Sequence, residues 1–172
     1  VPLTCDLQLD EATMHEALGV ATGAALCFLA RPNNPTGSLW DAAVIDRLIA
    51  AHPGTMFVLD EAYTRYAPGT SLWRADLPAN VTYMTTLSKV GLAALRLGYC
   101  IAPPTLAHAR HTVRHPYNVS TPSLILAEAV LTDFTAVQDQ LIAATIAGRE
   151  RLVGILARIP GAHVYPTHSN FA

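Results

Sequence analysis

Short apolar runs and apolar residues at helical spacing alternate along the first third of the chain. The runs Leu26–Ala30 and Met56–Leu59 are typical of strands buried on both faces of a sheet. The segment between them carries an apolar helical face, formed by Val44, Ile45, Leu48 and Ile49. Ser38 followed by Asp41 predicts a capping box at the start of this helix, and Pro53-Gly54 marks its end. Strand, helix and strand with short connections form the unit of a parallel sheet, so we expect an α/β fold.

Two more strands are predicted beyond the Pro/Gly-rich stretch at Pro68-Gly69. They lie at Val81–Thr85 and Leu97–Ala102. Pro103-Pro104 then opens a helix that extends to about Val113, because proline is favoured in the first turn of a helix. The whole pattern predicts a mostly parallel sheet flanked by helices.

The C-terminal third is predicted to be largely helical. Leu124–Leu131 indicates a buried helix, and Phe134–Arg158 indicates a long amphipathic one. The expected apolar face of the long helix is Val137, Leu141, Ile142, Leu152, Val153 and Leu156, and its expected solvated face includes Asp139, Arg149, Glu150 and Arg151. His163–Tyr165 predicts a short strand. We therefore expect residues 1–133 to be part of one domain and residues 134–172 to be a linker helix and the start of a smaller domain, with the fold incomplete at both ends.

Composition excludes several classes of protein. Of the 172 residues, 51% are hydrophobic and 14% charged, which is enough apolar surface for a large core. A net charge of −2 offers no basic face for nucleic acid or an anionic membrane. No apolar run approaches the ~20 residues of a membrane helix, and the start lacks a signal-peptide pattern. Cys5, Cys27 and Cys100 have no metal-type spacing, so we expect buried, reduced thiols in a cytoplasmic protein.

Three histidines, His108, His111 and His115, fall at spacings that two turns of a helix would bring together. Scattered solvent-facing histidines give the same spacing, and no cysteine or carboxylate lies nearby in the sequence. We therefore expect no metal site.

Side chains able to bind a ligand follow the predicted strands. The first strand is followed by Asn33-Asn34-Pro35-Thr36-Gly37, the second by Asp60 and Tyr63, and the third by Thr86, Ser88, Lys89 and Arg96. Ligands in open α/β sheets bind at the carboxyl ends of the strands. We therefore expect these groups to converge on one edge of the sheet.

Lys89 is the only lysine among the eleven basic residues of the chain. A general need for positive charge therefore does not explain it. Its neighbours Leu87, Val90 and Leu92 predict an apolar setting, which favours the neutral amine that bonds to a carbonyl carbon.

The set as a whole matches the functional groups of pyridoxal 5′-phosphate, whose aldehyde suits Lys89. The other matches are Asp60 for the ring nitrogen, Tyr63 and Asn34 for the ring oxygen, and Thr86, Ser88 and Arg96 for the phosphate. Each of these residues has an ordinary structural interpretation, as a turn, a cap or a surface charge. Their order and common placement at strand ends favour the cofactor.

These motifs also carry a family resemblance. The motifs are Asn33-Asn34-Pro35-Thr36-Gly37, Asp60-Glu61-Ala62-Tyr63, Ser88-Lys89 and Arg96-Leu97-Gly98-Tyr99. Their series resembles the aminotransferase group of type I pyridoxal-phosphate enzymes. With Val113–Ser120 and Ser169–Ala172, the chain is most similar to the histidinol-phosphate aminotransferase family.

The resemblance implies a role for each residue. Residues 1–133 would belong to the large cofactor-binding domain of the type I fold. Lys89 would bond the cofactor and then move a proton between the substrate and the cofactor. Asp60 would keep the ring nitrogen protonated, Tyr63 and Asn34 would hydrogen-bond the ring oxygen, and Ala62 would pack on one ring face.

The resemblance assigns the phosphate to Thr86, Ser88 and Arg96. The spacing from Lys89 to Arg96 is seven residues, whereas many relatives have eight. The family is dimeric, and its residues for ring stacking and for the substrate carboxylate lie outside this sequence. We therefore expect a homodimeric parent enzyme and an inactive isolated chain.

The implied reaction is transfer of an amino group between histidinol phosphate and 2-oxoglutarate. Decarboxylation of threonine phosphate, transamination of other amino acids, and an aminotransferase-like sensor domain of a regulator share these motifs. Product analysis separates the enzymes, and a DNA-binding module in the same protein would indicate the regulator.

Overall fold

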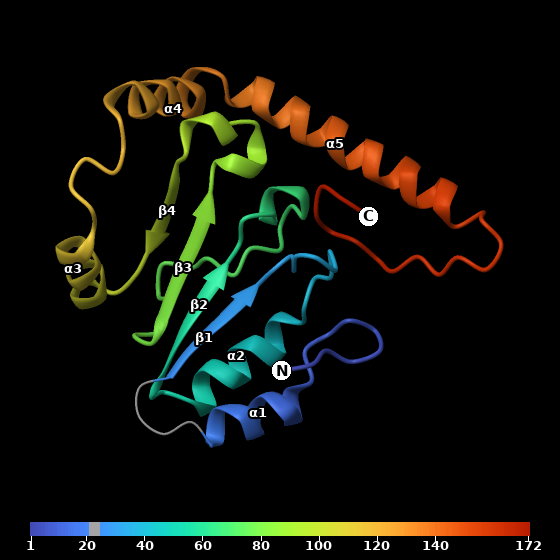
Figure 1. The fold of residues 1–172 in the computed structure, drawn as a ribbon, viewed down its shortest axis with the longest axis horizontal. Helices are drawn as coiled ribbons and strands as arrows, with labels where there is room; N and C mark the ends of the chain where they lie inside the picture. The colour runs from blue at the N-terminus through green and yellow to red at the C-terminus, as the bar shows by residue number, and fades with distance from the viewer. Residues whose placement is uncertain (21–24) are drawn as a thin grey trace.

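The structure is a computed structural model that describes residues 1–20 and 25–172. One sheet is flanked by helices (Figure 1). The strands are β1 (Ala25–Ala30), β2 (Thr55–Asp60), β3 (Val81–Thr86) and β4 (Gly98–Ile101). The helices are α1 (Glu11–Gly19), α2 (Ala42–Ala51), α3 (Pro104–Val113), α4 (Thr121–Asp133) and α5 (Thr135–Leu156), with short 3₁₀ turns η1 (Thr64–Tyr66), η2 (Ser88–Val90) and η3 (Ala93–Leu95). Among the described residues, no helix combines the length and apolar character needed to cross a membrane.

The four strands lie side by side in the order of the sequence. β1 pairs parallel to β2 and β2 parallel to β3, whereas β4 runs antiparallel to β3. Ala30 pairs with Asp60, and Asp60 pairs with Met84 near the end of β3, so β1, β2 and β3 all end at one edge of the sheet. The predicted α/β fold with a mostly parallel sheet is confirmed.

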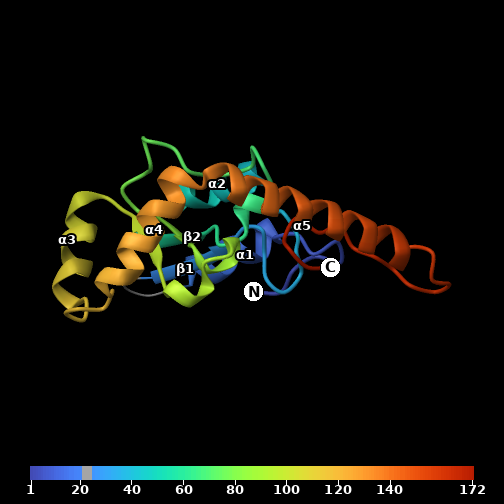
Figure 2. The same cartoon turned by 90° about the horizontal axis from the view of Figure 1, so that it is seen from above.

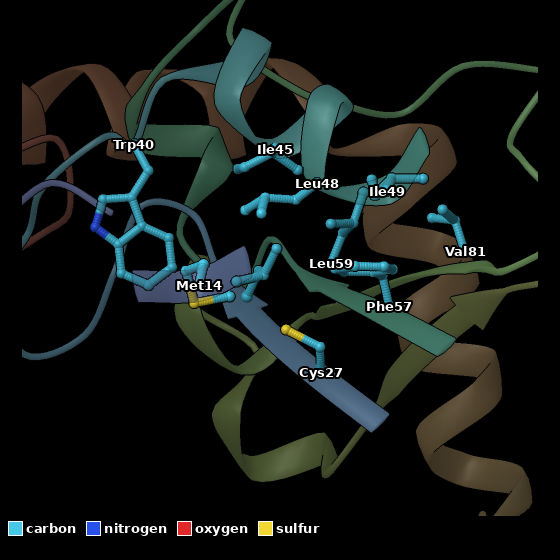
Figure 3. Packing of buried hydrophobic residues seen from close by; sticks show 10 residues of the cluster. Met14, Cys27, Trp40, Ile45, Leu48, Ile49, Phe57, Leu59 and Val81 are labelled. Carbon is cyan, nitrogen blue, oxygen red and sulfur yellow. The ribbon is translucent and has the colours of Figure 1, made fainter. Parts of the chain in front are cut away.

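The main core lies between one face of the sheet and the helix pair α1 and α2. Side chains of α2 point onto β1 and β2 (Figure 3). The buried cluster consists of Met14, Cys27, Leu29, Trp40, Ile45, Leu48, Ile49, Phe57, Leu59 and Val81. Apolar burial on this scale contributes ~1.5–3 kcal/mol for each large side chain. The predicted apolar face of α2 is therefore what holds the βαβ unit together.

The opposite face of β1 is exposed, so the prediction that this strand is buried on both faces is wrong. Cys27 and Leu29 are buried, whereas Leu26 and Phe28 are exposed. Successive side chains of a strand point to opposite faces, and α1 and α2 cover only one of them.

The capping box predicted at Ser38 is also wrong. Asp41 is the N-cap of α2, and its Oδ1 accepts a hydrogen bond from Ala43 N at 2.9 Å. Ser38 is instead buried in the preceding turn, where its hydroxyl lies 2.6 Å from that of Thr36. A carboxylate next to the first helical residue satisfies the free N–H groups directly, which leaves Ser38 to the turn.

The predicted burial of the C-terminal helices is largely wrong. In α4, Leu124, Ile125 and Leu126 are exposed. In α5, only Ile142 of the expected apolar face is buried, whereas Val137, Leu141 and Leu152 are exposed. Figures 1 and 2 show the reason: α5 extends away from α4 past the sheet, and only part of its surface meets the rest of the chain.

Two further expectations for the C-terminal third fail. Arg149 does not lie on the solvated face of α5, because its side chain is 8% exposed and its Nη1 atom donates to backbone carbonyls of Tyr66 and Ser169. His163–Tyr165 forms no strand and has no regular secondary structure. Its backbone finds no sheet partner among the described residues.

Exposure also corrects the prediction for the cysteines. Cys27 is buried in the core, but Cys5 and Cys100 are exposed. Cys100 lies on β4, where Gly98 and Tyr99 are exposed as well, and no residue of this strand belongs to the main core cluster.

Candidate active site

The turn after β1 presents Asn34 to the edge where β1, β2 and β3 end. Asn33 fixes the turn, because its N–H donates to Ser38 O at 2.8 Å and its carbonyl accepts from Gly37 N at 2.8 Å. Asn34 is exposed, and its Nδ2 donates to the hydroxyl of Tyr63 at 2.9 Å. The turn therefore joins two residues that are 29 positions apart in the sequence.

The end of β2 places Asp60 and Tyr63 beside this turn. Asp60 Oδ1 accepts a hydrogen bond from Ala62 N at 3.0 Å, which closes a tight turn directly after the strand. That turn directs Tyr63 inward, where it is 7% exposed and its ring meets Phe171 edge-on at 5.4 Å between centroids. Phe171 belongs to a motif that the sequence linked only to family membership, and its packing on Tyr63 was not predicted.

Lys89 lies in η2, directly beyond the end of β3. Its Nζ is 5.4 Å from the centroid of the Tyr63 ring, which is a cation–π distance. The residue is exposed. The apolar setting expected from its sequence neighbours is therefore wrong, because Leu87, Val90 and Leu92 are themselves only half-buried.

Six of the eight predicted site residues line one cavity of about 300 Å³. Its lining is Ala30, Pro32, Asn34, Asp60, Ala62, Tyr63, Thr86 and Lys89. A neighbouring cavity of about 400 Å³ shares Asp60, Ala62 and Thr86 and continues along β3 and β4 to Cys100. The expected convergence on one sheet edge holds for an amide, a carboxylate, a phenol, a hydroxyl and an amine.

The other two predicted residues, Ser88 and Arg96, do not line this cavity. Ser88 N donates to Thr86 Oγ1 at 3.1 Å, and that hydroxyl donates to Leu97 O at 3.1 Å. Arg96 is exposed, with a left-handed φ of 56°, and its Nη1 lies 3.4 Å from Ala93 O. The hydroxyls are thus near Lys89, while the guanidinium is directed back onto its own turn.

Glu61 is a buried acid that sequence reasoning missed, although it lies inside the motif that supplies Asp60 and Tyr63. It is 1% exposed, and its carboxylate accepts from Ser71 Oγ at 2.7 Å and from Leu72 N at 2.5 Å. Burial raises the pKa of Tyr83, and the nearby Glu61 carboxylate raises it further. A charged residue directly after an apolar strand is the signal that could have identified Glu61.

Arg31 is a second missed residue, at the start of the turn that carries Asn34. It is 7% exposed, its Nε donates to Trp40 O at 2.6 Å, and its Nη1 donates to Thr70 O. Burial lowers the pKa of Arg31, and Glu61 opposes that shift. Arg31 therefore ties the turn after β1 to the loop that Glu61 also holds.

Within residues 1–20 and 25–172, no three histidine, cysteine or acidic side chains lie close enough together to hold a metal ion.

Comparison with known proteins extends the resemblance to nearly the whole chain. A model of the family "Aminotransferase class I and II" matches residues 2–172. Histidinol-phosphate aminotransferase 1 of Burkholderia lata is 41% identical over 171 residues, which are 99% of this chain and 47% of that protein. Histidinol-phosphate aminotransferase of Acidovorax ebreus is 42% identical over 94% of this chain and 45% of its own length. The chain spans about half the length of the curated relatives it matches.

Solved structures agree in fold. Histidinol-phosphate aminotransferase from Sinorhizobium meliloti, in complex with pyridoxal-5′-phosphate, superimposes with a TM-score of 0.86 at 31% identity, covering 98% of this chain and 46% of that one. L-threonine-O-3-phosphate decarboxylase from Porphyromonas gingivalis gives a TM-score of 0.72 at 26% identity, covering 91% and 49%. The motifs, the sheet and the family match agree, and the chain belongs to the class I and II aminotransferase family.

Proposed function

We propose that residues 1–172 form the lysine-bearing part of a pyridoxal-phosphate-dependent aminotransferase that moves an amino group between histidinol phosphate and 2-oxoglutarate. The observation that carries the proposal is the grouping of Asn34, Tyr63 and Lys89 beside Asp60 in a chain about 40% identical to histidinol-phosphate aminotransferases. The substrates, the homodimer and the cytoplasmic location are parts of the same proposal. So is the division into a cofactor-binding domain (1–133) and the start of a small domain (134–172).

The donor set suits the cofactor at its ring end. When bound, the cofactor supplies an aldehyde and a protonated ring that accepts electrons from the substrate carbon. Lys89 Nζ would bond to that aldehyde and, once released, carry the proton at the substrate α-carbon. The Asp60 carboxylate would hold a proton on the ring nitrogen, and Asn34 and Tyr63 already form the hydrogen-bonded pair that would face the ring oxygen.

The phosphate end is less complete within this chain. Thr86 and Ser88 would donate hydroxyl or backbone N–H groups to the phosphate, since both lie beside Lys89. Arg96 would have to turn its side chain from Ala93 O toward them. A bidentate guanidinium contact with phosphate is favourable enough to drive such a rearrangement of an exposed side chain.

A second candidate is decarboxylation of threonine phosphate, favoured by the structural similarity to the Porphyromonas gingivalis enzyme. Both candidates use an amine that carries a phosphate ester. They differ in the bond broken at the substrate carbon, which is C–H in transamination and C–C in decarboxylation.

The test uses the whole protein, saturated with pyridoxal 5′-phosphate. We expect glutamate to form from 2-oxoglutarate when histidinol phosphate is supplied, and no carbon dioxide from threonine phosphate. Borohydride reduction should fix the cofactor on Lys89, as located by peptide mass. Lys89→Ala should abolish this capture, whereas Asp60→Ala should retain capture and lower turnover by about 10²–10⁴-fold. Capture that persists in Lys89→Ala would contradict the assignment of the amine.

A further inference from the structure

Two buried side chains from other parts of the chain hold the backbone of the Lys89 turn. The hydroxyl of Tyr66 donates to Lys89 O, and Gln138 Nε2 donates to Val90 O at 3.3 Å. Tyr66 and Gln138 are each 5% exposed. Successive carbonyls of η2 are therefore fixed by side chains of η1 and α5, not by a strand or a long helix.

Helix α5 contacts both the Lys89 turn, through Gln138, and the backbone of Tyr66, through Arg149. Arg149 Nη1 donates to Tyr66 O at 3.2 Å and to Ser169 O at 2.8 Å. Gln138 and Arg149 are eleven residues apart, which is about three helical turns, so they lie on the same face of α5. The Lys89 turn is thus held directly by Gln138 and indirectly, through Tyr66, by Arg149.

The segment Tyr63–Tyr66, which includes η1, contacts Lys89 at both its side-chain amine and its backbone carbonyl. Tyr63 immediately precedes η1, and the Tyr63 ring faces the Lys89 amine at 5.4 Å. Tyr66, within η1, binds the Lys89 carbonyl, and its own N–H donates to Tyr63 O at 2.9 Å. The position of the lysine backbone is therefore coupled to the ring that faces its amine.

We propose that Tyr66 is a positioning residue for Lys89, through the hydrogen bond from its hydroxyl to the Lys89 carbonyl. The inference rests on the proposed function, because it concerns how the amine is held for bonding to the cofactor aldehyde. Burial raises the pKa of Tyr66, so the hydroxyl remains a proton donor over the working range of an enzyme. The nearby Asn170 side chain opposes that shift.

Tyr83 provides a matched control within the same chain. It is 6% exposed, as buried as Tyr66, and its hydroxyl lies with Ser71 and Glu61 and not with Lys89. Tyr66→Phe and Tyr83→Phe each remove one buried hydroxyl without changing the ring. If Tyr66 contributed only to folding, the two variants would lose similar amounts of activity for similar losses of stability.

The experiment compares both variants with the parent in the whole protein. Chemical denaturation gives the free energy of unfolding, borohydride capture with peptide mapping gives the rate of cofactor bonding at Lys89, and steady-state kinetics separates kcat from KM. For Tyr66→Phe we expect capture rate and kcat to fall about tenfold, with little change in KM, because a small displacement of a reacting group is costly. For Tyr83→Phe we expect both rates to stay close to the parent at a comparable loss of stability.

A cofactor-free measurement separates this inference from the proposed function. The rate at which acetic anhydride acetylates Lys89 in the apoprotein, followed by peptide mass over a range of pH, reports the reactivity of the amine in the absence of cofactor. We expect severalfold faster labelling in Tyr66→Phe only. If the parent captures no cofactor, the proposed function fails, while the acetylation comparison still tests Tyr66. If Tyr66→Phe labels and captures at parental rates, or changes in step with Tyr83→Phe, the positioning role is overturned.

Discussion

Gly37 occupies a position where an added methyl group has no room. Its φ of +69° is in the left-handed region, and an ideal Cβ would lie 2.2 Å from Thr167 Oγ1 and 2.8 Å from Thr167 Cβ. Thr167 cannot rotate away freely, because its hydroxyl donates to Phe171 O at 2.6 Å. The Gly37 carbonyl also accepts from His168 N at 2.8 Å, so the two segments are in contact along their backbones. Gly37→Ala should therefore separate the Asn34 turn from the C-terminal segment.

The expected cost of Gly37→Ala combines three contributions. A left-handed φ costs an alanine roughly 1–2 kcal/mol relative to glycine. Overpacking against a fixed neighbour costs about 1–3 kcal/mol more, and each hydrogen bond lost as Thr167 moves adds about 1 kcal/mol. With one hydrogen bond lost, we expect Gly37→Ala to lower the free energy of unfolding by about 3–6 kcal/mol.

Gly69 separates the backbone contribution from the clash. Its φ is +77°, but a Cβ there would meet no heavy atom within 4 Å. Denaturation of Gly69→Ala should therefore show only the φ cost of roughly 1–2 kcal/mol. Adding Thr167→Gly to Gly37→Ala should restore the stability lost to the clash but not the stability lost to the left-handed φ. If Gly37→Ala costs no more than Gly69→Ala, the proposed contact between Gly37 and Thr167 is refuted.

Two further predictions concern titratable groups, the buried Glu61 and the half-buried His168. Glu61→Ala should lower the free energy of unfolding by about 2–4 kcal/mol, because Ser71 and the Leu72 N–H lose their buried acceptor. Glu61→Gln keeps one acceptor oxygen and should lose less stability. Equal losses of unfolding free energy for the two variants in denaturation would contradict this account. Burial, and to a smaller extent Arg149, lower the pKa of His168 below 6.5, so the fold favours the neutral ring. The unfolded chain then binds the extra proton, and stability should fall as pH drops from about 6.5 through the lowered pKa and level off below it. His168→Gln should flatten this part of the stability–pH curve, and an unchanged slope would count against the assignment.

The grouping of most candidate site residues around one cavity was predictable because their signals are local. Asp60 comes directly after an apolar run, and Asn34 and Lys89 each lie four residues beyond the end of a predicted strand. Parallel strands bring such positions to one edge whatever the rest of the fold does. The order of motifs also indicated the family before any geometry was known. The side-chain direction of Arg96 was not predictable, because a left-handed turn residue takes its orientation from its local backbone.

Burial and long-range contacts could not be predicted in the same way. The apolar residues of α4 and α5 signal helices correctly, but Leu124 and Leu141 are exposed because no described segment covers them. The charge of Arg149 indicated a solvated face, yet the backbone carbonyls of Tyr66 and Ser169 give it a buried site. A hydrophobic pattern indicates which surface of a helix can be buried. It does not indicate which segment, if any, packs against that surface.

The sequence by itself determined the βαβ order, the family and the residues at the strand ends, since these depend on neighbours a few positions apart. Only the tertiary structure decided that Tyr66 meets the Lys89 carbonyl, that Gly37 abuts Thr167, and that one face of β1 is open. The physical reason is that such contacts join segments separated by tens of residues, and their geometry is set by how whole elements pack.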